Sequence, residues 1–81
     1  MRSTIRSMKK HSYTVIYEED PEGGFVASAP SLPGCYSQGD TLEQAKSNIT
    51  EAIELYLETL HEERKEVPEE HLWQGRVEVA I

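Results

Sequence analysis

Glu58 and His61 are the two side chains of this sequence whose spacing comes nearest to that of a metal site. A Glu-x-x-His pair puts a carboxylate and an imidazole on one face of a helix, and di-iron bundles use this spacing. Such a centre also needs a second pair and two further glutamates from other helices, whereas this chain has one long helical pattern. The sequence therefore predicts no metal centre and no cofactor at this pair.

Nucleophilic catalysis is not indicated either. Cys35 is the one cysteine, and no histidine lies near it in the sequence. His11 and His71 fall in predicted loops and have no evident partner. We predict that Cys35 is a small buried hydrophobic residue, and a lone cysteine fits a reducing compartment such as the cytoplasm. No catalytic residue is predicted.

Carboxylates dominate the body of the chain. Residues 13–81 hold all fifteen Asp and Glu and four Lys and Arg, a balance of −11, while residues 1–12 carry +4. An acidic body repels nucleic acid and favours basic partners. The acids most concentrated at one place are Glu18, Glu19, Asp20 and Glu22.

The length fits one small domain, which we place at residues 12–81. Residues 1–11 have no sustained pattern and are predicted to form a flexible arm. No apolar run approaches the roughly 20 residues that a membrane span needs, and no apolar region follows the basic start as in a secretory signal. We expect at most weak nucleic-acid contacts from the arm, through Arg2, Arg6, Lys9 and Lys10.

Three strands are predicted before the helix. Residues 12–18 and 25–29 are rich in β-branched and aromatic residues and flank a polar turn with Pro21, Gly23 and Gly24. Pro30 should end the second strand, and Pro33-Gly34 should turn the chain into a short third strand over residues 35–38.

The strongest pattern is an amphipathic helix that starts at Leu42. Thr41 is the expected N-cap, and Gln44 three residues later completes a capping box. We expect fraying from His61 onward and an end by Val67, because Pro68 follows. The apolar stripe consists of Leu42, Ala45, Ile49, Ala52, Ile53, Tyr56, Leu57 and Leu60.

Residues 76–81 alternate between polar and apolar side chains and predict a fourth strand, parallel to the first after a right-handed crossover. Trp73, just before it, is expected in the core. The predicted class is α+β in the order β-β-β-α-β, a three-strand antiparallel meander with one helix on one face. The other face, with residues such as Ile16 or Val15, has no element to cover it, so we expect a homodimer or higher homo-oligomer.

Five segments in a fixed order carry a family resemblance over about residues 13–60: residues 13–20, 24–30, 32–35, 39–45 and 48–53. This ordered set resembles the HicB antitoxin family. The resemblance implies a partial ribonuclease H-like fold and an antitoxin that binds a HicA messenger-RNA-cleaving toxin. Longer members carry a C-terminal DNA-binding module, and we expect a short form without it here.

That resemblance raises an alternative, a degenerate metal-dependent nuclease. Two-metal hydrolysis needs several converging carboxylates. Glu18, Glu19 and Asp20 are adjacent on a strand and alternate between faces, while Glu51 and Glu54 flank the helix stripe toward solvent. A small transcriptional regulator acting through the basic arm is a further alternative. We favour a non-catalytic antitoxin whose partner-binding residues are Glu18, Glu19, Asp20 and Glu22, facing a basic HicA-like toxin.

Overall fold

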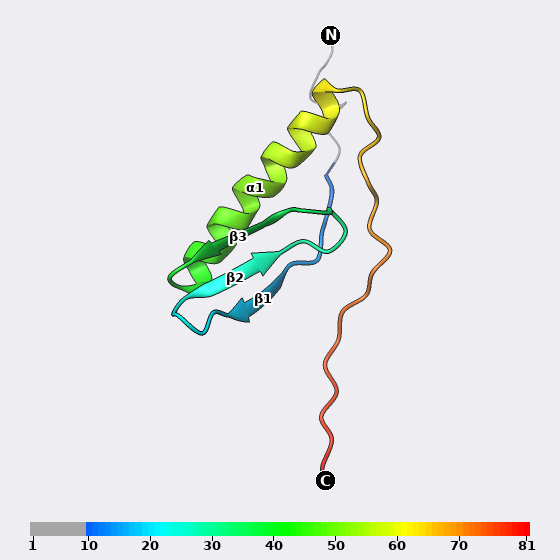
Figure 1. The fold of residues 1–81 in the computed structure, drawn as a ribbon. Coiled ribbons are helices and arrows are strands. Elements are labelled where there is room, and N and C mark those ends of the chain that lie inside the picture. The colour runs from blue at the N-terminus through cyan, green and yellow to red at the C-terminus, as the bar shows by residue number, and fades with distance from the viewer. Residues whose placement is uncertain (1–9) are drawn as a thin grey trace.

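The computed structural model describes residues 10–81 and shows three strands followed by one helix (Figure 1). The strands form one antiparallel sheet in the order β1-β2-β3. The predicted α+β class and the β-β-β-α order are therefore confirmed, while the likeness to ribonuclease H stays a prediction. The elements are β1 (Ile16–Glu19), β2 (Phe25–Ser28), β3 (Tyr36–Gly39) and α1 (Leu42–Glu62).

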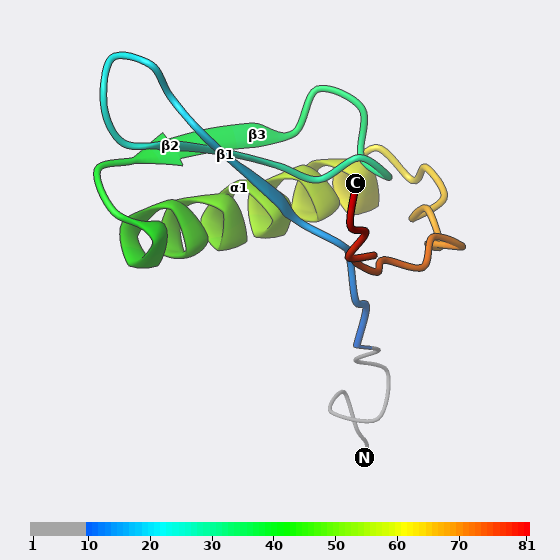
Figure 2. The same ribbon diagram turned by 90° about the horizontal axis from the view of Figure 1, so that it is seen from below.

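The sheet has one covered face and one open face. Tyr17, Ala27 and Ser37 lie opposite one another across the three strands, and Ala27 is fully buried. Opposite residues of antiparallel strands share a face, so this row marks the side on which α1 packs. Figure 2 shows α1 lying along this side, and its contacts are mainly with β3 and β2. β1 is thus an edge strand that the helix leaves largely uncovered.

The core is small and lies between α1, β2 and the loop that follows β2. The predicted helix stripe faces it, since Ala45 and Ile49 are buried and the side chains from Ala52 to Leu57 on that face pack against it. The two ends of the stripe lie outside this core: Leu42 has half of its surface exposed, and Leu60 is half-buried beyond the core residues. The buried residues are Ala27, Ala29, Leu32, Cys35, Ala45 and Ile49.

The loop between β2 and β3 folds back on itself to bury Leu32. The N–H groups of Leu32 and Cys35 donate to the carbonyls of Ala29 and Leu32, both at 2.9 Å. Gly34 has a φ of 79°, which a residue without Cβ adopts at little cost. The predicted Pro33-Gly34 turn is confirmed, and Cys35 is buried as expected.

α1 begins with the predicted cap. The Thr41 hydroxyl accepts from the N–H of Gln44 at 3.0 Å, and the Gln44 amide oxygen accepts from the N–H of Asp40 at 2.9 Å. The first turn also comes very close to β3, because a Cβ on Gly39 would lie 2.4 Å from the nitrogen of Ala45. A glycine is therefore required where β3 meets the helix.

α1 ends at Glu62, five residues before the latest end that the sequence predicts. The N–H of Lys65 donates to the Leu60 carbonyl at 2.9 Å, and the N–H of Arg64 donates to the His61 carbonyl at 3.1 Å. With a φ of 58° at Arg64, these bonds form a Schellman motif. The helix is therefore closed by its own hydrogen bonds before Pro68 is reached.

The predicted fourth strand is wrong for the isolated chain. Residues 76–81 are extended but pair with no strand in the described part of the protein, and Figure 1 shows this segment running away from the sheet. Trp73 is 97% exposed, so its predicted core position is also wrong. The alternation shows that a segment can form a strand, but a ladder needs a partner edge, which alternation does not specify.

Candidate partner-binding surfaces

The acids predicted to bind a partner lie at the end of β1 and in the turn that follows it. Asp20 shapes this turn: its carboxylate accepts from the N–H of Glu22, and its own N–H donates to the carbonyl of Gly24, each at 2.9 Å. The turn is therefore ordered before any partner arrives. We call Glu18, Glu19, Asp20 and Glu22 the acidic turn.

The structure brings only part of the acidic turn together. Glu18 pairs with Val26 and points to the open face, whereas Glu19 pairs with Phe25 on the α1 side. Asp20 and Glu22 line one shallow pocket of about 250 Å³. A nuclease-like convergence of these carboxylates is thus not what the strand geometry produces.

Asp40 is an acid of this surface that the sequence reasoning missed. It lies between β3 and α1 and lines the same pocket as Asp20 and Glu22. A usable signal was present, because in a meander the first turn and the segment after the third strand lie at the same end of the sheet. Glu43 follows in the first helical turn, where the helix dipole favours a carboxylate.

A second acidic surface runs along α1. Its members recur every three or four residues and are all exposed, and Leu55 beside them is 63% exposed. This spacing puts them on one side of the helix, away from the core stripe. We call Glu51, Glu54, Glu58 and Glu62 the acidic helix face.

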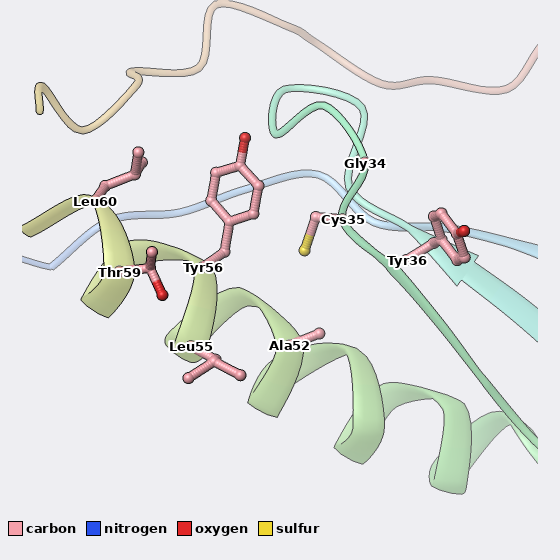
Figure 3. A pocket seen from close by; sticks show the side chains of 8 residues that line it. All are labelled: Gly34, Cys35, Tyr36, Ala52, Leu55, Tyr56, Thr59 and Leu60. Carbon is pink, nitrogen blue, oxygen red and sulfur yellow. The ribbon is translucent and has the colours of Figure 1, made fainter. Parts of the chain in front are cut away.

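An apolar pocket of about 430 Å³ separates α1 from the start of β3. In Figure 3 the Cys35 thiol and the Tyr56 ring face each other across it. Burial raises the pKa of the Cys35 thiol, which favours the protonated form over a nucleophilic thiolate. This pocket can hold an apolar side chain but offers no acid–base chemistry.

The most connected carboxylate of the structure is Glu70, which the sequence reasoning did not single out. It accepts hydrogen bonds from the Thr14 N–H (2.7 and 2.9 Å), the Thr14 hydroxyl (2.5 Å) and the Ser31 hydroxyl (2.9 Å). The Thr14 hydrogen bonds hold the pKa of Glu70 below its usual value. Glu70 thus ties the segment after α1 to the approach to β1.

Tyr13 makes a second contact between the approach to β1 and the segment after α1. Its hydroxyl donates to the Pro68 carbonyl at 2.5 Å. Burial, and then the nearby carboxylates of Glu70 and Glu69, raise the pKa of Tyr13, so the phenol stays protonated and can donate.

The described residues offer neither a metal site nor a membrane-spanning helix. Among residues 10–81, no group of three or more His, Cys, Asp or Glu side chains is arranged to hold a metal ion, and Glu58 and His61 are both exposed. Within the same stretch, α1 is too polar to cross a bilayer. Arg2, Arg6 and Lys9 of the basic arm lie outside the described residues, and Lys10 is exposed.

Comparison with known proteins gives a consistent answer. Residues 13–76 match the family model described as the HicB-like antitoxin of bacterial toxin–antitoxin systems. UPF0150 protein ssr1765 of Synechocystis is 51% identical over 69 residues, which cover 85% of this chain and 87% of the relative. UPF0150 protein Ta0767 of Thermoplasma acidophilum is 42% identical over 59 residues, 73% of this chain and 86% of the relative. The match spans the sheet, α1 and the segment tied down by Glu70, and the chain belongs to the HicB-like antitoxin family.

Proposed function

We propose that this HicB-like antitoxin neutralises a HicA-type messenger-RNA-cleaving toxin by covering the toxin's RNA-binding surface. The observation that carries the proposal is the charge of the body, −11 over residues 13–81, spread over exposed and pre-ordered elements. A protein that binds RNA needs a basic surface, because phosphate contacts supply much of its affinity. An acidic protein competes for the same surface.

The acidic turn is the first proposed contact. Three features support it: its carboxylates are concentrated, Asp40 adds a further charge beside them, and the turn is held by backbone hydrogen bonds. A pre-ordered surface loses little conformational entropy on binding. The acidic helix face, with Leu55 as an apolar contact, is the second proposed surface.

We propose no catalytic step for this chain. Glu18 and Glu19 point to opposite faces, and one Asp20 oxygen is already engaged by the Glu22 N–H. Inhibition would then be stoichiometric and take place in the cytoplasm, where the proposed toxin meets its substrate. If the purified protein cleaved RNA with magnesium or manganese and lost that activity as Asp20→Asn, the nuclease alternative would replace this proposal.

The experiment uses the small basic protein encoded in the adjacent reading frame, if one is present, as the toxin. Messenger-RNA cleavage is titrated with the antitoxin, and the toxin's affinity for a non-cleavable RNA is measured with and without it. Occlusion predicts inhibition that saturates at a fixed ratio and mutually exclusive binding of RNA and antitoxin. A ternary complex of toxin, RNA and antitoxin would contradict occlusion.

A further inference from the structure

The chain after Glu70 carries the most exposed large apolar side chains of the described residues. Trp73, Val77 and Val79 are 97%, 87% and 76% exposed, and Ile81 is fully exposed. Among the described residues, residues 71–81 make no hydrogen bond with the rest of the protein. We call residues 76–81 the tail strand. An apolar, regularly alternating segment of this kind is suited to a sheet and costly to leave in water.

The place where this segment leaves the body is fixed. Glu70 is held at Thr14, and residues 72–76 then pass Thr14, Ile16 and Pro30 around a shallow space of about 460 Å³. The segment before the tail strand therefore lies beside the start of β1. Beyond this point the tail strand departs from the sheet instead of following β1 (Figure 1).

β1 has a free edge to which another strand could add. It pairs with β2 on one side, its other edge has no partner among the described residues, and all four of its side chains are exposed. α1 packs on β3 and β2 and leaves β1 largely uncovered (Figure 1). An edge of this kind is a template for strand addition.

The side-chain pattern indicates how the two would fit. On the α1 side, Tyr13, Val15 and Tyr17 form an apolar row, of which Tyr13 and Val15 pack against the core. The open face of β1 carries Glu18. Pairing that sets Val77 and Val79 beside the apolar row puts Arg76 and Glu78 together on the solvent-exposed face, the side of Glu18. The opposite assignment would place Arg76 and Glu78 against tyrosine and valine.

We propose that the tail strand adds to the free edge of β1 in a second copy of this chain, and that two copies exchange their tail strands reciprocally. Each copy then supplies one edge and one strand, so the assembly closes as a two-fold dimer. Six residues span about 20 Å, enough to cover the whole of β1. The exchange removes the free β1 edge and buries the exposed valines, and Trp73 lies at the crossing between the two copies.

The first test measures the oligomeric state of the full chain by sedimentation equilibrium, comparing Val79→Asp with Leu55→Asp. Both remove an exposed apolar side chain and add one negative charge, so neither should unfold an isolated copy. We expect a wild-type dimer at micromolar concentration, a dissociation constant at least about 100-fold weaker for Val79→Asp, and little change for Leu55→Asp. A wild-type monomer, or a Val79→Asp dimer as tight as wild type, would overturn the proposal.

The second test separates exchange from pairing within one copy. Isotope-labelled and unlabelled chains are unfolded together, refolded, and examined by filtered nuclear Overhauser spectroscopy. Exchange predicts contacts between the Val77 and Val79 methyl groups of one copy and the Tyr17 ring of the other. Two results would rule out the swap of tail strands between copies. One is that these contacts appear only within a copy. The other is that the amide hydrogens of the tail strand exchange with solvent as fast as those of a free peptide.

Discussion

Thr14 and Glu70 are 56 positions apart in the sequence and are joined by three hydrogen bonds, two from the Thr14 N–H and one from its hydroxyl. This contact sets the path of the chain after α1. It holds the segment after α1 against the edge of the sheet, so that residues 72–76 lie beside the start of β1. The proposed exchange of tail strands between two copies depends on this path.

Glu70→Gln should destabilise the protein at neutral pH, because the amide group cannot accept from Thr14 and Ser31 as a carboxylate does. Since the pKa of Glu70 is lowered in the folded state, its stabilising contribution is present above the ordinary pKa of glutamate. That contribution disappears as the pH falls through the lowered pKa. Thermal unfolding should therefore separate the variant from wild type at neutral pH and bring them together in acid. A constant difference at all pH values would contradict this role.

Arg64→Gly should stabilise the protein. Arg64 occupies the left-handed position of the Schellman motif with a φ of 58°, where a side chain costs about 1 kcal/mol. The gain is expected at about 0.5–1 kcal/mol, reduced by the greater freedom of glycine in the unfolded chain. Urea unfolding measures it, with Glu63→Gly as the control at a position of negative φ, where a loss is expected. Equal effects of the two changes would show that the motif does not constrain the helix end.

Gly39→Ala should destabilise the protein by about 1–3 kcal/mol, since the new Cβ would lie 2.4 Å from the Ala45 nitrogen and α1 would have to move. Gly75→Ala is the matched control, because a Cβ there meets nothing within 4 Å. Chemical unfolding of the two variants compares them directly. If both were equally stable, the close approach of β3 to the helix would be of no consequence.

Local patterns predicted the parts of the fold that depend on neighbouring residues. The hairpin turn, the Pro33-Gly34 turn, the Thr41 cap and the apolar stripe of α1 are each encoded within a few positions. β1 begins later than predicted, at Ile16 instead of residue 12, because the residues before it have no neighbour in the ladder.

The parts that sequence reasoning missed depend on distant residues. Glu70 is one of several glutamates near the helix end, and nothing beside it signals that Thr14 and Ser31 will meet it. Asp40 joins the acidic turn only through the topology of the sheet. The tail strand has the pattern of a strand, but the pattern does not say which edge, in which copy, receives it.

The role of the acidic turn is tested most directly by the association rate with the toxin, measured at low and high salt. Glu18→Gln, Asp20→Asn and Glu22→Gln together remove three charges while keeping the side-chain shapes and an acceptor at Asp20 for the Glu22 N–H. The control changes Glu63, Glu66 and Glu69 to glutamine, removing the same charge from exposed positions at the other end of α1 and beyond it. A parallel variant with Glu51, Glu54 and Glu58 changed to glutamine reports on the acidic helix face.

If the acidic turn meets the toxin's RNA-binding surface, the first variant should associate about tenfold more slowly at low salt, and its rate should depend less on salt than that of wild type. The control should stay close to wild type. If the acidic-turn variant and the control associate at the same rate with the same salt dependence, the turn is not the contact and does not occlude the toxin's RNA-binding surface.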